Sequence, residues 1–191
     1  MLLDIKNVSL SFADRTLFQN VNLRVEEGDR IGLVGANGEG KSSLLNLLNG
    51  TISPTSGECS RRRDLQIGYL QQNSGLNSAR TIQEELRSVF EPLLKAQQQL
   101  VELSQEIERY QTQQSKDSIY QTILEDYNKT MSYFEANEGY QIDVKIRTVL
   151  NGMGFGAFSL DTVCNTLSGG EKTRLALAKL LLQKPELLML D

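Results

Sequence analysis

The sequence predicts an α/β fold in which an antiparallel β layer precedes a parallel core, with a helical subdomain added to it. Three observations predict this fold. Apolar residues alternate with polar ones in 3–12 and again in 21–25, and a period of two indicates half-buried strands. The apolar run 30–34 leads into a glycine-rich turn and then into leucines at helical spacing. From 81 to 134, apolar residues recur every three or four positions, as in amphipathic helices.

Composition indicates an ordinary globular protein. The chain has 191 residues, of which 39% are hydrophobic, and a net charge of −4. This length is enough for one core with a small subdomain, and the charge gives no general reason to bind nucleic acid. Cys59 and Cys164 make no disulfide framework. No segment resembles a signal peptide or reaches the length of a membrane span, so we expect a cytoplasmic protein without membrane insertion.

The first strands are expected to be joined by turns at Asp14–Arg15 and at 26–29. The apolar run 31–34 no longer alternates, which is typical of a strand buried on both faces of a parallel sheet. Phe12 ends the first strand. Its ring could pack in the core or stack on an aromatic base, and the sequence alone favours the core.

A phosphate-binding loop is predicted from Gly35 to Ser42. This stretch reads GANGEGKS and matches G-x-x-x-x-G-K-[ST]. Glycines at three of its positions let the backbone curl tightly, and the loop N–H groups and the positive end of the following helix would face the phosphates. Lys41 would reach the β and γ oxygens, and the Ser42 hydroxyl would ligate Mg²⁺. The alternative is an ordinary strand-to-helix turn with a solvated lysine.

Two later strands add polar groups near this loop. A strand is expected at 65–70, ending at Gln71–Gln72, where a glutamine could reach a metal-bound water or the γ-phosphate. Four apolar residues, 187–190, precede Asp191, which indicates a buried parallel strand with a carboxylate at its C-terminal edge. Ligands collect at that edge in parallel sheets, so Asp191 could share a Mg²⁺ ion with Ser42.

The helical part is expected to contain a hairpin of two antiparallel helices within 81–134 and a further helix from about Tyr140 to Met153. Between Arg80 and Tyr140, eleven acidic residues outnumber six basic ones, so this arm should not bind RNA by charge alone. A last helix is expected after Ser168, which forms a capping box with Glu171. The glycines between them leave amides open to an anion, although a well-capped helix without further role explains the pattern equally well.

In this order, GANGEGKS, the strand-end glutamine, LSGGE and LLMLD resemble an ATP-binding cassette (ABC) domain, a P-loop NTPase. The resemblance implies that Gly35–Ser42 is the Walker A loop, Gln72 the Q-loop residue and Asp191 the Walker B aspartate. It also makes Phe12 the residue that stacks on adenine. The implied sites are Phe12, Gly35, Asn37, Gly38, Gly40, Lys41, Ser42 and Ser43 for ATP; Gln72 and Asp191 for catalysis; Ser42, Gln72 and Asp191 for Mg²⁺; and the signature Leu167, Ser168, Gly169, Gly170 and Glu171 for the nucleotide of a facing cassette.

Within that family, the hairpin and the stretch YQIDVKIRTVLNGMGF resemble the ABC-F branch, whose members are tandem cassettes that act on ribosomes. This resemblance implies an ATPase serving translation or antibiotic resistance, with a second cassette or a homodimer, and the ribosome or tRNA, as partners. The alternatives are the ATP-binding subunit of a membrane transporter and a non-hydrolysing interaction module. The expected domain boundaries are 1–78 for the nucleotide-binding core, 79–160 for the helical subdomain and 161–191 for the signature helix and Walker B strand.

The sequence departs from the family pattern in several places. Glu39 stands where a small residue is usual, and Ser43 where threonine is usual. An acid two residues before Lys41 should repel a triphosphate unless it points to water, so we expect weakened affinity for ATP. The glutamate that follows the Walker B aspartate and the switch histidine are absent from the chain. We therefore expect the first part of a longer ATPase, and this piece alone should bind nucleotide weakly and hydrolyse almost none.

Overall fold

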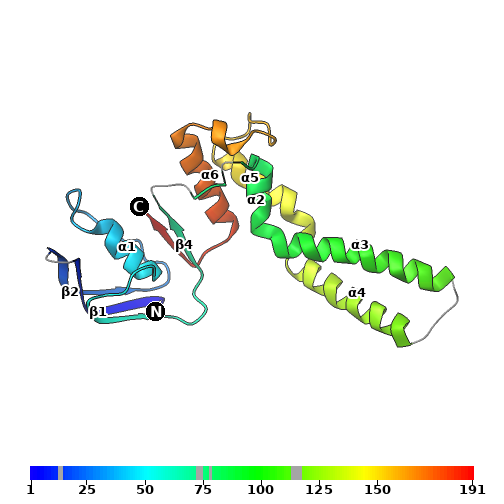
Figure 1. The fold of residues 1–191 in the computed structure, drawn as a ribbon, viewed down its shortest axis with the longest axis horizontal. Helices are drawn as coiled ribbons and strands as arrows, with labels where there is room; N and C mark the ends of the chain where they lie inside the picture. The colour runs from blue at the N-terminus through cyan, green and yellow to red at the C-terminus, as the bar shows by residue number, and fades with distance from the viewer. Residues whose placement is uncertain (13–14, 72–74, 78, 113–117) are drawn as a thin grey trace. The chain divides into compact units, whose positions relative to one another are not determined.

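The structure, a computed structural model, divides the chain into two units, each with its own hydrophobic core (Figure 1). The first unit comprises Met1–Gly75 and Gln183–Asp191, and the second comprises Leu76–Leu182. The segment 161–191, expected from the sequence as the last part of a single ABC domain, contributes residues 161–182 to the second unit and 183–191 to the first. The residues that the structure describes are 1–12, 15–71, 75–77, 79–112 and 118–191.

An antiparallel sheet of three strands opens the first unit. Strands β1 (Leu3–Phe12), β2 (Arg15–Val25) and β3 (Ser56–Arg61) lie in the order β2-β1-β3. The pairing register shifts between Ile5 and Val8, so the buried positions of β1 change parity there, as expected at a β-bulge. The buried aliphatic residues of β1 are therefore Leu3, Ile5, Val8 and Leu10.

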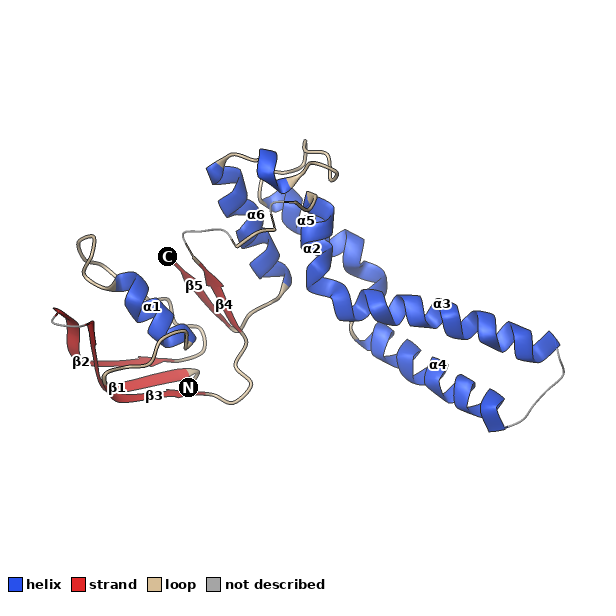
Figure 2. Ribbon diagram, viewed as in Figure 1, coloured by secondary structure: helices blue, strands red, loops and turns tan. Residues whose placement is uncertain are grey.

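A second, parallel sheet consists of β4 (Ile67–Leu70) and β5 (Leu187–Leu190), seen as the separate pair of red arrows in Figure 2. The two strands are in register, with Ile67 opposite Leu187 and Leu70 opposite Leu190. Both strands were predicted from the sequence. The full burial expected for β5 was wrong, because only Met189 is buried and Leu190 remains 55% exposed.

The buried strand predicted at 31–34 was also wrong. The described backbone has no strand there, and the side chains of Ile31 and Val34 are 48% and 99% exposed. A strand needs a neighbour to pair its N–H and C=O groups. Since β4 and β5 pair only with each other among the described strands, the run 31–34 has no neighbouring strand to pair with and forms no ladder.

Helix α1 (Lys41–Asn49) follows the glycine-rich loop. Its buried leucines belong to the hydrophobic core of the first unit, together with residues of the antiparallel sheet. It ends at Gly50 in the left-handed conformation (φ 86°), as predicted from Asn49–Gly50. Arg61 of β3 donates from Nη2 to the carbonyl of Leu47 at 3.1 Å and from Nη1 to that of Asn49 at 3.3 Å. The Leu47 carbonyl also accepts from the Gly50 N–H at 3.0 Å, so Arg61 adds a second donor there and supplies one to the Asn49 carbonyl, in the last turn, where carbonyl groups lack partners within the helix.

The second unit is helical. Its elements are α2 (Ile82–Arg87), the short 3-10 turn η1 (Ser88–Phe90), α3 (Glu91–Thr112), α4 (Ser118–Ala136), the turn η2 (Gly139–Gln141), α5 (Ile142–Gly152), the turn η3 (Cys164–Thr166) and α6 (Gly169–Leu182). The helices α3 and α4 run side by side as a hairpin (Figure 1), and the remaining helices surround one core. The expected hairpin and the helix near 140–153 are confirmed, while the connection between the two helices of the hairpin includes 113–117, which lie outside the described residues.

The core of the second unit joins α2, α5 and α6 to the base of the hairpin. Its residues with at most 2% exposure include Ile82, Leu86, Phe134, Ile146 and Leu175. No helix in the described part of the chain is long and apolar enough to cross a lipid bilayer.

Candidate functional site

The phosphate loop begins after the apolar run 31–34 and ends at the first turn of α1. Two of its glycines require their residue type, because Gly38 and Gly40 have φ angles of 85° and 94°. A Cβ on Gly40 would in addition lie 3.3 Å from the Cβ of Leu17. The loop thus takes a path that residues with side chains rarely follow, and it leaves the N-terminus of α1 without a side-chain cap.

Lys41 lies folded back over its own loop. Its Nζ donates to the carbonyl oxygens of Gly35 at 2.8 Å and Ala36 at 2.7 Å. The ammonium group is therefore held at the loop, within the lining of the pocket described below, and does not pair with a carboxylate among the described residues. A polyphosphate that enters the loop would exchange these two neutral acceptors for charged ones, which make stronger hydrogen bonds.

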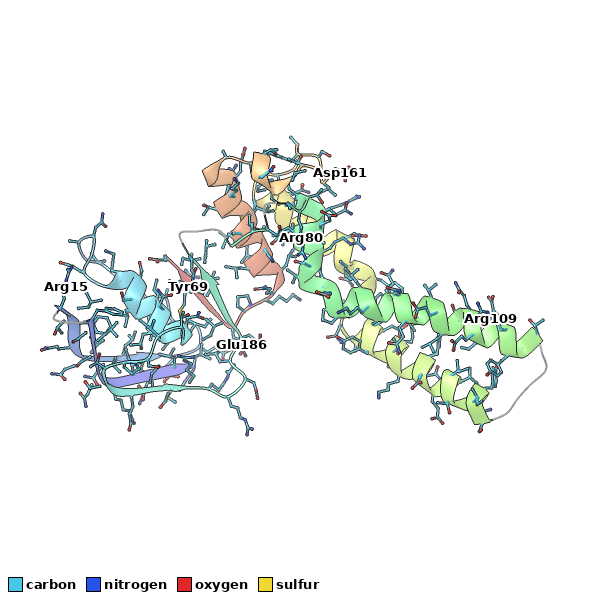
Figure 3. All side chains as sticks on the ribbon, in the orientation of Figure 1. Arg15, Tyr69, Arg80, Arg109, Asp161 and Glu186 are labelled. Carbon is cyan, nitrogen blue, oxygen red and sulfur yellow. The ribbon has the colours of Figure 1, made fainter. Side chains whose placement is uncertain are left out.

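Ser42 and Asp191 meet although 149 positions separate them. The Ser42 hydroxyl donates to Oδ1 of Asp191 at 2.9 Å, and the Tyr69 hydroxyl donates to Oδ2 at 3.5 Å. Tyr69 projects from β4 (Figure 3). Burial, and then the nearby carboxylate of Asp191, raise the pKa of Tyr69 above its usual value, so its hydroxyl stays a donor at neutral pH.

A pocket of about 360 Å³ connects these groups. It contains seven of the eight residues expected to bind ATP, all except Gly35. Phe12 is 52% exposed and is therefore not a core residue, which removes the alternative that the sequence alone favoured. Leu17 is a lining residue that the sequence did not indicate. The lining residues are Phe12, Leu17, Asn37, Gly38, Gly40, Lys41, Ser42, Ser43 and Asp191.

The oxygen atoms at the end of this pocket suit a magnesium ion. Mg²⁺ prefers oxygen ligands, and adjacent ligands of an octahedral ion with bonds of 2.0–2.1 Å lie about 3 Å apart. The 2.9 Å between Ser42 Oγ and Asp191 Oδ1 meets that requirement. These two side chains would hold the ion. Gln72, the third expected ligand and a predicted catalytic residue, lies outside the described residues.

Two side chains near the loop were not assigned a role from the sequence. Arg15 of β2 (Figure 3) donates from Nη2 to the carbonyl of Gly38 at 3.2 Å. The second side chain is that of Tyr69. A role for Tyr69 near Asp191 could have been predicted from its place close to the end of β4, because β4 pairs in register with β5, which directly precedes Asp191. Arg15 carried no such signal, since its partner is a backbone atom in a distant loop.

The signature residues belong to the second unit. Ser168 donates from both its N–H and its hydroxyl to Oε2 of Glu171 at 2.7 Å, and the Glu171 N–H donates to Ser168 Oγ at 3.4 Å. The capping box is thus confirmed. These hydrogen bonds from Ser168 hold the pKa of Glu171 below its usual value. Leu167 is buried, and a Cβ added to Gly169 or Gly170 would meet no atom within 4 Å, so the first turn is open to a ligand.

Comparisons with known proteins identify the family of the chain. The family model described as ABC transporter matches residues 18–191. The chain is 34% identical over 190 residues to the uncharacterized ABC transporter ATP-binding protein YfmM of Bacillus subtilis, covering all of the chain and 36% of that protein. It is 33% identical over 189 residues to the tylosin resistance ATP-binding protein TlrC of Streptomyces fradiae, covering 99% and 34%. It is 29% identical over 177 residues to the energy-dependent translational throttle protein EttA of Escherichia coli K12, covering 93% and 30%.

Among solved structures, the fold resembles the one titled "Structure of ATP binding subunit of ABC transporter", with a TM-score of 0.65, 18% identity, and coverage of 100% of this chain and 66% of that chain. The chain spans about a third of the length of the relatives named above. The match of the family model covers most of the sequence and includes the loop, the signature and Asp191. The chain therefore belongs to the ABC transporter family of ATP-binding domains.

Proposed function

We propose that this chain is the ATP-binding cassette of an ABC-F protein, an ATPase that acts on the ribosome. Binding of ATP follows from membership of the family, and ABC domains generally bind it with Mg²⁺ and hydrolyse it. The observation that supports this chemistry here is the contact between Ser42 and Asp191 at 2.9 Å, because it places an ion-binding oxygen pair beside the phosphate loop.

Different residues of the pocket would bind different parts of the nucleotide. The glycine-rich loop offers its N–H groups to the phosphates, and Lys41 supplies a positive charge at the β and γ positions. Phe12 offers an exposed aromatic face at the same pocket, suited to stacking on a base. A bound Mg²⁺ would neutralise charge that develops on the transferred phosphoryl group. Gln72 and Asp191 remain our candidates for catalytic residues.

The signature would act on a nucleotide bound by another cassette. Its open first turn, with Gly169 and Gly170 behind the Ser168–Glu171 capping box, suits contact with a phosphate from outside. We therefore expect ATP turnover to require a facing cassette, either a second one in the same protein or a second copy of this chain. The turnover rate per molecule should rise with protein concentration if two copies must pair, and a rate independent of concentration would contradict pairing in solution.

The ribosome assignment is supported by the hairpin of α3 and α4, which have 22 and 19 residues, and by two relatives. TlrC is named for tylosin resistance and EttA for a translational throttle. The second candidate is the ATP-binding subunit of a membrane transporter, which is favoured by the naming of YfmM as an ABC transporter ATP-binding protein.

Co-sedimentation distinguishes the two. Purified ribosomes are pelleted through a sucrose cushion with the chain and a non-hydrolysable ATP analogue. We expect the chain to pellet with ribosomes, and Lys41→Ala, which loses the phosphate-binding ammonium, to pellet much less. A chain that stays in the supernatant in every nucleotide state would contradict the ribosome proposal and favour the transporter subunit.

A further inference from the structure

Glu39 is the unusual residue of the phosphate loop, and the structure gives its carboxylate a specific partner. The Ala36 N–H donates to Oε2 of Glu39 at 2.8 Å. In the opposite direction, the Glu39 N–H donates to the Ala36 carbonyl at 3.4 Å. One residue thus closes the turn 36–39 through both its backbone and its side chain.

The carboxylate of Glu39 is not part of the lining of the nucleotide pocket. The loop residues that line the pocket are Asn37, Gly38, Gly40, Lys41, Ser42 and Ser43, and Glu39 is not among them. Glu39 therefore does not place its negative charge among the residues that would surround the phosphates. Gly35 makes the arrangement possible, because a Cβ at that position would lie 2.5 Å from Oε2 of Glu39.

The side chains of Glu39 and Lys41 both form hydrogen bonds with the start of the loop. Of the two, only Lys41 is expected to bind the phosphates of the nucleotide. Lys41 Nζ donates to the carbonyls of Gly35 and Ala36. When Lys41 turns to the phosphates it must release both carbonyls. Among the described hydrogen bonds, two side-chain contacts then still hold the turn 36–39: the one from Arg15 to the Gly38 carbonyl, and the one from the Ala36 N–H to Glu39, which alone acts on the first residue of the turn.

We propose that Glu39 is a positioning residue that preorganises the phosphate loop for the triphosphate by accepting a hydrogen bond from the Ala36 N–H. We call this hydrogen bond the clasp. The loop is rich in glycine, so it loses much conformational freedom when it becomes ordered, and a contact present before binding reduces that loss. The clasp uses the carboxylate oxygen as an acceptor. The negative charge itself remains unfavourable for ATP, so the acceptor and the charge act in opposite directions and can be separated by substitution. The inference rests on binding of ATP by this loop and not on the ribosome assignment.

Two variants separate the effects. Glu39→Gln keeps an oxygen that can accept from Ala36 and removes the charge, whereas Glu39→Ala removes both. Titration with a fluorescent ATP analogue in Mg²⁺ buffer should show Glu39→Gln binding more tightly than Glu39→Ala by about three- to tenfold, the range expected for a modest hydrogen bond. Glu27→Gln, an exposed acid in the turn 26–29, gives the same change in net charge and should leave the affinity unchanged.

A second measurement does not need nucleotide. Hydrogen exchange of the Ala36 amide in the free chain should be slow in the unsubstituted protein and in Glu39→Gln, and faster in Glu39→Ala. Equal affinities and equal exchange for Glu39→Gln and Glu39→Ala would overturn the proposal. Failure of the chain to bind the analogue would count against the site itself and not against the clasp, because the exchange measurement still reports on Ala36. Faster exchange in Glu39→Ala together with rescue by Glu39→Gln would support it.

Discussion

Substitution of Lys179 by methionine should destabilise the second unit more than any exposed charge substitution. Its Nζ donates to Oε1 of Glu85 at 2.5 Å, joining α6 to α2. The side chain of Glu85 is fully buried, and its Oε2 has no hydrogen-bond partner among the described residues. Arg80, labelled in Figure 3, is the other nearby cation, 3.8 Å from that oxygen.

The expected magnitude follows from this environment. Removing one partner of a buried ion pair leaves an uncompensated charge and costs about 3–5 kcal/mol. Lys179 keeps 25% exposure of its side chain and Arg80 remains close, so we expect the lower end, about 3 kcal/mol. For a chain of this size that corresponds to a fall in melting temperature of about 6–12 °C.

Urea unfolding followed by far-ultraviolet circular dichroism measures this cost, and two further variants make it interpretable. Lys95→Met breaks an exposed pair with Glu91 on α3 and should cost less than about 1 kcal/mol. The double variant Glu85→Met with Lys179→Met should cost less than Lys179→Met alone, since it leaves no unpaired charge. The reasoning would be refuted if Lys179→Met cost no more than Lys95→Met, or if the double variant cost as much as Lys179→Met alone or more.

Three other expectations concern local features. Ser168→Ala removes the acceptor of the Glu171 N–H and should cost about 1 kcal/mol of helix stability, measured by thermal unfolding; an unchanged melting temperature would contradict it. A second capping box joins Thr81, the N-cap of α2, to Glu84. Hydrogen bonds from Thr81 and Ser168 lower the pKa of Glu84 and Glu171 below 4.5, so the stability that these groups contribute is present above pH 4.5 and is lost as pH falls through their lower folded-state values. A urea midpoint that rises on acidification from pH 5 to 3, attributable to these groups by Glu171→Gln, would argue against this. Gly57→Ala should destabilise the chain more than Gly28→Ala by about 1–3 kcal/mol. Both glycines have φ near 88°, but a Cβ at Gly57 would lie 2.4 Å from the Asn7 carbonyl oxygen, whereas a Cβ at Gly28 would meet no atom within 4 Å. Equal losses of stability in urea would exclude the clash.

Features that depend on a few neighbouring residues were predictable from the sequence. The turn of the phosphate loop, the end of α1 at Gly50 and the cap at Ser168 follow from glycine conformation and from side-chain acceptors three residues away. The helices α3 to α5 follow from apolar residues at helical spacing. In each case the local sequence contains both partners of the interaction that forms the structure.

Features that depend on distant partners were not predictable. The run 31–34 has the composition of a buried strand, but strand formation requires a neighbouring edge, which the described strands do not provide. Glu85 was counted among the acidic residues of the helical part, and its burial depends on Lys179, 94 positions away. The clasp of Ala36 by Glu39 was missed for another reason. The sequence shows the charge of the acid, whereas acceptance of the Ala36 N–H by its carboxylate depends on the path of the loop backbone.

The position of Asp191 shows how a distant site can still follow from a local pattern. Its carboxylate reaches Ser42 because β5 pairs with β4 in one register, and the Asp191 N–H continues that register by donating to the Leu70 carbonyl at 3.1 Å. Side chains alternate along a strand, so a slip by one residue would exchange the faces of Met189 and Leu190 and move the carboxylate away from the loop. Met189 is 5% exposed and Leu190 is 55% exposed, so such a slip would expose the buried methionine. The same apolar packing that holds β5 therefore selects the register that places an acid beside the serine.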